Sequence, residues 1–217
     1  MSEIKNIIFD FDGTIGDSFD IVCNIGCEIA NKHGIHSSEE EFSFIFKNMG
    51  IRELAKKFSI NKREFIELIY IIRHRFSKRT DEIDIFDGMK EVLEELCNEG
   101  YVLGIISSNS KKNVNKILQH REISKYFSFV KKTSLFGKHK TIEKVLQKEG
   151  MKKSQTIYVG DEIRDLKACR KIRVNVISVS WGFNSRNLLE SKKARHIVDT
   201  PKELLQTITY LSGTNFT

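Results

Sequence analysis

The sequence predicts an α/β protein in which a parallel sheet carries an all-helical insertion after its first strand. A short apolar run near the N-terminus ends in acidic residues, and a long stretch with helical periodicity follows it. From Gly88 onward, apolar runs of strand length alternate with helical segments, which is the pattern of a parallel sheet. With 217 residues, 40% of them hydrophobic, the chain can bury a sizeable core.

The first predicted strand is the apolar run Ile7, Ile8 and Phe9, typical of a strand buried on both faces. Asp10 and Asp12 follow where this strand leaves the core, and Gly13 permits the chain to turn there. Ligands of open α/β sheets bind at the carboxyl ends of the strands, and clustered carboxylates there can hold Mg²⁺. The alternative is an ordinary turn, because Asp and Gly are common turn residues.

The next part of the chain has helical periodicity with no strand between its segments. The first helix is predicted from Ser18 to His33, with an apolar stripe that includes Ile21, Ile25 and Ile29. The segments that follow it run from Glu39 to Phe46, from Ile51 to Phe58 and from Lys62 to Phe76. This region predicts an all-helical unit over about residues 16–83.

The second half alternates between helix and strand, and we therefore expect a Rossmann-like parallel-sheet core formed by residues 1–15 and 84–217. Pro201 is expected to start the last helix, because proline is favoured in a first turn. The helices are predicted over 88–100, 111–118, 140–148 and 163–172, and the strands over 102–106, 128–131, 156–159 and 174–179.

The formal net charge is +7, but the basic residues are spread along the chain and form no recognisable nucleic-acid motif. We therefore expect an anionic small molecule rather than a nucleic acid as the partner. No N-terminal signal segment and no run of about 18 apolar residues is present, which favours a cytoplasmic protein without a membrane partner. The four cysteines lack metal-site spacing and are expected to be free thiols. The sequence leaves the oligomeric state open.

Four segments, in order, carry a resemblance to a known family. The first is Asp10-Phe11-Asp12-Gly13-Thr14, and the second is an apolar strand that ends at Ser107. The third is a lysine, Lys138, ahead of a helix, and the fourth is the strand that ends in Gly160-Asp161-Glu162-Ile163-Arg164-Asp165. Together they resemble the haloacid dehalogenase superfamily, in its phosphoglycolate-phosphatase-like branch with a helical cap. With the segments near Trp181 and Asp199, the resemblance covers the whole chain.

This resemblance implies a Mg²⁺-dependent phosphatase that hydrolyses a small phosphorylated metabolite, similar to phosphoglycolate, through an aspartyl-phosphate. In that scheme Asp10 is the nucleophile, and Asp12 is the acid that protonates the leaving oxygen and then the base that activates water. Mg²⁺ is expected on the carboxylates of Asp10 and Asp161 and on the backbone carbonyl of Asp12.

The same resemblance assigns supporting roles. Asp165, and less directly Glu162, orient a metal-bound water or the lysine. Ser107, Ser108 and Lys138 hold the phosphoryl oxygens, although Ser107 is also a candidate helix cap before Lys111. His139 stands where the family has a proline, so the choice between Lys138 and Lys140 stays open at this point.

The resemblance also implies that residues 16–83 are a mobile cap that sets substrate choice. Met49 and Arg52 lie at a glycine break between two helical segments. Arg52 is a candidate contact for a substrate carboxylate or distal phosphate, and the alternative is a solvent-facing arginine in the first turn of a helix. A phosphomutase of a sugar phosphate uses the same motifs and is the alternative, and a non-enzymatic binding protein on this fold is a further one. A dehalogenase is disfavoured because Asp12 is present.

Overall fold

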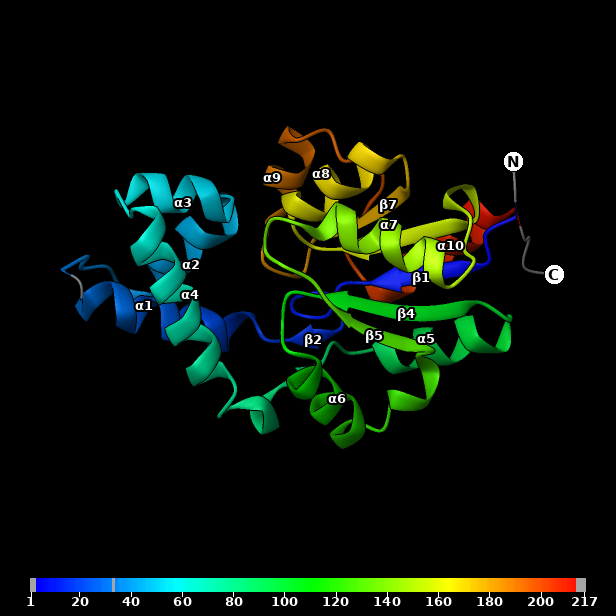
Figure 1. The fold of residues 1–217 in the computed structure, drawn as a ribbon, viewed down its shortest axis with the longest axis horizontal. Helices are drawn as coiled ribbons and strands as arrows, with labels where there is room; N and C mark the ends of the chain where they lie inside the picture. Colours follow the sequence, from blue (N-terminus) through cyan, green and yellow to red (C-terminus); the bar gives the residue numbers. More distant parts are fainter. Residues whose placement is uncertain (1–2, 33, 214–217) are drawn as a thin grey trace.

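The computed structural model describes residues 3–32 and 34–213, and its centre is a six-stranded parallel sheet with the strand order β5-β4-β1-β6-β7-β8 (Figure 1). The innermost strands are buried because helices cover both faces of the sheet. The strands are β1 (Asn6–Phe9), β4 (Val102–Ser107), β5 (Phe129–Lys132), β6 (Thr156–Gly160), β7 (Asn175–Val179) and β8 (Ile197–Val198).

Strand β1 lies between β4 and β6, and its last residue, Phe9, pairs with Ile105 on one side and Val159 on the other. From β1 the chain builds one half of the sheet, β4 and β5, and then returns to build β6, β7 and β8 on the other side. The strand order therefore reverses at β1. In open α/β sheets such a switch point is where ligands bind, beyond the carboxyl ends of the strands.

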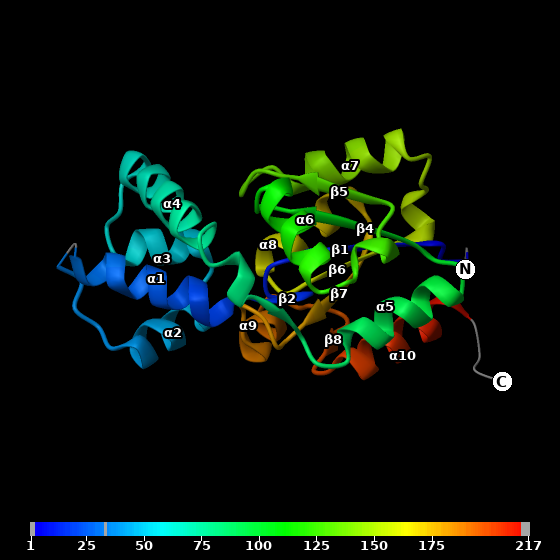
Figure 2. The same cartoon turned by 90° about the horizontal axis from the view of Figure 1, so that it is seen from below.

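Helices pack on both faces of this sheet (Figure 2). Successive side chains of a strand point to opposite faces, so Ile7 and Phe9 belong to one core cluster and Ile8 to the other. The first cluster includes residues of α5 (Met89–Asn98), α6 (Lys111–His120) and α10 (Pro201–Ser212). The second includes residues of α7 (Lys138–Lys148) and α8 (Ile163–Ile172), and the short helix α9 (Arg186–Ser191) precedes β8.

The helical insertion lies beyond one end of the sheet, on the left of Figures 1 and 2. It consists of α1 (Phe19–Lys32), α2 (Glu39–Asn48), α3 (Ile51–Lys57) and α4 (Lys62–Phe76). The strands β2 (Gly16–Asp17) and β3 (Asp84–Ile85) pair antiparallel where the chain enters and leaves it. One core residue, Phe183, packs edge-on against Phe19 of α1 and Phe46 of α2, so the insertion and the core share an aromatic cluster.

The predicted fold class is confirmed, and most predicted elements differ from the observed ones only at their ends. Two differences have a clear cause. Strands β2 and β3 were not predicted, because two-residue strands are too short to show a periodicity. Helix α7 begins at Lys138 rather than Lys140, because its first turn is polar and shows no apolar stripe. His33, the predicted end of the first helix, lies outside the described residues. Among the described residues, no helix is both long and apolar enough to span a bilayer.

Candidate active site

Three neighbouring strands deliver polar side chains to one edge of the sheet. Asp10 directly follows β1, Ser107 is the last residue of β4, and Asp161 directly follows β6. All three are buried, and the backbone N–H of Asp10 still donates to the carbonyl of Val159 at 2.8 Å. The sheet ladder therefore extends to the position of Asp10 and fixes where its carboxylate lies.

The Asp10 carboxylate is held at both oxygens. Its Oδ1 accepts from the backbone N–H of Phe11 at 2.8 Å, and its Oδ2 accepts from Nζ of Lys138 at 2.5 Å. Lys138 Nζ also contacts Oδ1 of Asp165, and only 2% of the lysine side chain is exposed. Burial by itself lowers the pKa of Lys138, but the charges of Asp10 and Asp165 outweigh burial and raise that pKa, so the lysine stays charged.

Asp12 lies two residues after Asp10, in the loop that follows β1, and its carboxylate accepts three hydrogen bonds. The donors are Oγ of Ser107 at 3.3 Å, Nδ2 of Asn109 at 3.1 Å and Oγ of Ser18 at 3.4 Å. Burial and the nearby negative charge of Asp10 raise the pKa of Asp12 to about 6. A carboxyl group with such a pKa can both release and take up a proton near neutral pH.

Asp10, Asp161 and Asp165 form a buried acidic cluster, with one carboxylate oxygen of each within 4.8 Å of the others. Thr14 Oγ1 donates to Oδ1 of Asp161 at 2.9 Å, and the backbone N–H of Phe183 donates to Oδ2 at 2.7 Å. Burial, followed by the charge of Glu162 and then of Asp10, raises the pKa of Asp161 well above its usual value. Converging hard oxygen donors that repel one another fit a divalent cation such as Mg²⁺, which relieves that repulsion.

Two glycines let the backbone approach this cluster. Gly13 has a φ of +75°, and a Cβ at this position would lie 2.3 Å from Oδ2 of Asp161. A Cβ on Gly182 would lie 2.2 Å from the carbonyl oxygen of Gly13 and 2.4 Å from the same Oδ2. The loop after β1 and the loop after β7 can therefore enclose Asp161 only because both positions lack a side chain.

A cavity of about 580 Å³ lies between this edge of the sheet and the helical insertion. Asp12 and Ser108 line it from the core and Met49 from the insertion, so these predicted residues share one space. Arg52 does not line it. Its guanidinium instead stacks over the ring of Phe136, 4.4 Å from the centroid, at the edge where the insertion meets the core.

The structure distinguishes between the two candidate lysines and between the two interpretations of Ser107. Lys138 is buried against Asp10, whereas Lys140 is exposed on the first turn of α7. The hydroxyl that caps α6 belongs to Ser110, so the cap interpretation of Ser107 is wrong. Ser107 Oγ instead lies against Asp12 and accepts from the backbone N–H of Asn109 at 3.0 Å.

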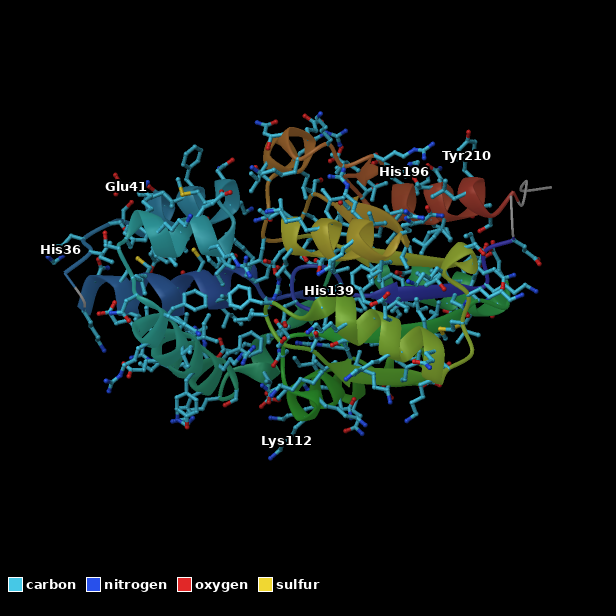
Figure 3. All side chains as sticks on the ribbon, turned by 45° about the horizontal axis from the view of Figure 1, so that its top comes forward. His36, Glu41, Lys112, His139, His196 and Tyr210 are labelled. Atoms are coloured by element: carbon cyan, nitrogen blue, oxygen red, sulfur yellow. The ribbon has the colours of Figure 1, made fainter. Side chains whose placement is uncertain are left out.

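The predicted residues Glu162 and Asp165 lie at the start of α8. The Asp165 Oδ2 accepts from the backbone N–H of Glu162 at 3.2 Å, while the Glu162 carboxylate pairs with Arg164 at 2.5 Å. No histidine was predicted for the site. Figure 3 shows three of them far apart, with His36 at the outer end of the insertion, His139 on α7 and His196 near the last helix.

Sequence reasoning missed other residues of the site. Asn109 donates to Asp12, and Nη2 of Arg164 lies 3.9 Å from Oδ2 of Asp10. Arg164 stands inside the quoted segment that ends at Asp165, and Asn109 stands two residues after Ser107. The only signal in the sequence was therefore a polar residue close to a predicted group. Arg73 also lines the cavity, but it comes from a basic run of α4 in which nothing distinguishes it from its neighbours.

Comparisons with known proteins agree with this geometry. A family model described as haloacid dehalogenase-like hydrolase matches residues 7–179. A phosphoglycolate phosphatase of Synechococcus elongatus is 30% identical over 209 residues, which are 96% of this chain and 99% of that protein. The pyrophosphatase PpaX of Bacillus mycoides is 22% identical over 97% of this chain and 100% of its own length.

Solved structures share the fold. The crystal structure of a predicted phosphatase from Clostridium acetobutylicum superposes with a TM-score of 0.81 at 24% identity, covering 96% of this chain and 100% of that one. A haloacid dehalogenase-like protein from Streptococcus pneumoniae has a TM-score of 0.78 at 23% identity, covering 94% and 98%. The family match spans most of the chain and includes the strand ends that carry Asp10, Ser107 and Asp161. The chain therefore belongs to the haloacid dehalogenase-like hydrolases.

Proposed function

We propose that this hydrolase is a Mg²⁺-dependent phosphatase that acts on a small phosphorylated metabolite similar to phosphoglycolate. The observation that carries the proposal is that two neighbouring buried carboxyl groups have different surroundings. Asp10 is held by the Lys138 ammonium, while burial raises the pKa of Asp12 to about 6. One group is thus prepared to attack as an anion and the other to carry a proton.

In the first step, an Asp10 oxygen forms a bond to phosphorus while the bond from phosphorus to the ester oxygen breaks. Asp12 gives its proton to the departing oxygen, so the alcohol leaves neutral. Lys138 and the Ser107 hydroxyl, together with Ser108, are proposed to hold the phosphoryl oxygens. The product of this step is an aspartyl-phosphate on Asp10.

In the second step, Asp12, now ionised, takes a proton from a water molecule whose oxygen attacks phosphorus. The bond from phosphorus to Asp10 breaks, and the free carboxylate and inorganic phosphate are restored. Mg²⁺ would be held by Asp10, Asp161 and the Asp12 carbonyl, and it would neutralise charge on the phosphoryl oxygens. Asp165 holds Lys138 in place from the other side.

We also propose that residues 16–83 act as the cap of this site and that residues 1–15 and 84–217 are the catalytic core. In support of this, the loop between α2 and α3 meets α8, where a Cβ on Gly50 would lie 2.6 Å from Ile163. Asn48 and Ser185 are also joined by a hydrogen bond of 2.8 Å between the insertion and the core. Substrate must enter between these surfaces, so the insertion is expected to open and close.

The test is phosphate release by the purified protein from a panel of phosphorylated metabolites with Mg²⁺ present, including phosphoglycolate and sugar phosphates. Asp10→Asn serves as the blank, because an amide cannot attack phosphorus as a carboxylate does. Hydrolysis by the parent protein but not by a folded Asp10→Asn variant supports the proposal, and equal rates contradict it. An isomerised sugar phosphate without phosphate release would instead identify a phosphomutase, and no turnover on any panel member would favour a binding protein.

A further inference from the structure

Two arginines from different parts of the chain meet at Ser108, a residue of the proposed phosphoryl site. Arg73 of α4 donates from Nη2 to the Ser108 carbonyl at 3.0 Å, and Arg164 of α8 donates from Nη2 to the Ser108 hydroxyl at 3.3 Å. Both line the cavity that Asp12 also lines. The guanidinium groups thus approach from the helical insertion and from the core toward the same residue.

Both guanidinium groups keep unused capacity to bind an anion, although Arg164 already has acidic neighbours in Glu162 and Asp10. Arg164 pairs with Glu162 through Nε at 2.7 Å, but its Nη1 is buried and makes no hydrogen bond with any of the residues described here. Arg73 has no ion pair within residues 3–32 and 34–213, whereas its neighbour Arg75 pairs with Glu28 at 2.8 Å. Partial burial and then the charge of Arg164 lower the pKa of Arg73. A guanidinium without an ion-pair partner and an unsatisfied buried donor on the same cavity both favour the binding of an anion there.

The position of the two arginines indicates which part of the substrate would carry this anion. The proposed phosphoryl site is formed by Asp10, Lys138, Ser107 and Ser108, near the ends of the strands. Arg164 Nη2 lies next to this site, 3.9 Å from Oδ2 of Asp10, whereas Arg73 lines the cavity from the helical insertion. Asp12 lines the same cavity, so the leaving group must extend into it in order to receive its proton. A group bound there belongs to the alcohol half of the substrate.

We infer that Arg73 and Arg164 together bind a second anionic group, carried by the leaving-group half of the substrate. This inference rests on the proposed phosphatase function and narrows it to substrates with two anionic ends. It also gives the insertion a reason to close, since Arg73 reaches the anion only when α4 lies against Ser108. Arg52, the arginine expected from the sequence, stacks on Phe136 outside this cavity.

The test compares Arg73→Ala with the parent protein on three substrates of similar size. Phosphoglycolate carries a carboxylate, pyrophosphate carries a second phosphate, and 2-hydroxyethyl phosphate has a neutral hydroxyl in the same place. Loss of a charge-assisted hydrogen-bond donor should lower kcat/KM by about 10- to 100-fold more for an anionic substrate than for the neutral ester, mainly through KM. The anionic substrate that shows the loss identifies the group that is bound.

Arg75→Ala is the matched control, because it removes the same charge from the same helix, two residues away, where the partner is Glu28 within the insertion. It should leave the preference for anionic substrates unchanged. Arg73→Lys keeps the charge without the planar fork and should fall between alanine and arginine. An equal loss on all three substrates with Arg73→Ala, or a parent protein that prefers the neutral ester, overturns the inference.

A binding measurement separates this result from a failure of the proposed function. Calorimetry compares 3-phosphonopropionate, which cannot be hydrolysed, with 3-hydroxypropylphosphonate. The parent protein should bind the phosphonate with the carboxylate at least about tenfold more tightly than the one with the hydroxyl, and Arg73→Ala should lose this difference. If the parent protein shows no turnover but this binding pattern appears, the phosphatase proposal fails while the anion site stands. If turnover appears without the pattern, the reverse holds.

Discussion

Asp12, the proposed acid and base, lowers the stability of the folded protein when it is ionised. In metal-free protein, burial and the charge of Asp10 raise its pKa to about 6, above the ordinary value of 3.8. The folded state then holds the proton more tightly than the unfolded state. The ionised carboxylate therefore destabilises the fold increasingly as the pH rises from about 4 to about 6, and by its full amount above that range.

We expect Asp12→Asn to raise the free energy of unfolding by about 1 to 2 kcal/mol at about pH 8 in the presence of EDTA. The difference should become small near pH 4, because Asp12 is then protonated in the folded state and only partly ionised in the unfolded state. Urea unfolding at the two pH values measures it. Activity should fall by about 10²- to 10⁴-fold, and less for an aryl ester whose leaving group needs no proton. A variant less stable than the parent at the higher pH would contradict the burial argument.

Lys138 and Lys140 provide a matched pair within one turn of α7. Lys138 is buried between Asp10 and Asp165, whereas Lys140 is exposed. We expect Lys138→Ala to lose at least about 100-fold in kcat/KM, equivalent to about 2.7 kcal/mol, and Lys140→Ala to lose little. Steady-state kinetics with circular dichroism as a folding check decides this, and the reverse order would move the functional lysine by two residues.

Much of this site could be predicted at the level of single residues, because its acids stand at strand ends. Asp10 and Asp161 each follow an apolar run, and the ends of adjacent parallel strands must meet. Arg73 could not be found in this way. Its place depends on how α4 packs against the β4 end of the core, which is a tertiary contact that leaves no periodicity in the sequence.

At the scale of the elements, the loop after β1 is shaped by its contact with Asp161. Gly13 and Gly100 both have positive φ, +75° and +83°, but only Gly13 faces a neighbour that a Cβ would strike, since nothing lies within 4 Å at Gly100. Comparing alanine at the two positions therefore separates backbone strain from close approach. Both variants carry a left-handed strain of about 1 kcal/mol.

We expect Gly13→Ala to lose at least about 1 kcal/mol more of unfolding free energy than Gly100→Ala, because overpacking adds to the strain. It should also lose most of its activity, since Asp161 has to move. Thermal or urea unfolding of both variants, with kinetics of each, provides the measurement. Similar losses in the two variants would show that the loop tolerates a side chain at Gly13.

How well the sequence predicts a helix or strand depends on the length of that element. The helices of the insertion and the main strands of the sheet could be placed within a few residues, because each is long enough to show its period. Strands β2 and β3 are formed by pairing between Gly16 and Ile85 and between Asp17 and Asp84, residues about 70 positions apart. Such short strands exist only through their partner, so local sequence carries no sign of them.

Across the whole molecule, the most acidic buried region lies at the edge of the sheet that faces the helical insertion. Asp10, Asp161 and Asp165 are buried together, and Lys138 contacts Asp10 and Asp165 but not Asp161. Burial raises the pKa of Asp161 well above its usual value. Without a cation the unfolded chain therefore ionises at this residue more readily than the folded protein, which lowers the stability of the fold at neutral pH. A bound divalent cation should relieve this repulsion and stabilise the protein as a whole.

We therefore expect Mg²⁺ to raise Tm in proportion to the logarithm of its concentration above Kd, by RT ln(1 + [Mg²⁺]/Kd) in free energy. Asp161→Asn should start from a higher Tm in EDTA, because the amide removes a group that resists ionisation in the folded protein, and should respond to Mg²⁺ much less than the parent. Glu190→Gln, at an exposed position of α9 where Glu190 pairs with Arg186, is the control for a nonspecific effect of charge. The scan is run in EDTA and at increasing Mg²⁺ for all three proteins. An equal Tm rise in the parent and in Asp161→Asn would place the cation elsewhere, and no rise in the parent would argue against Mg²⁺ as the metal of this site.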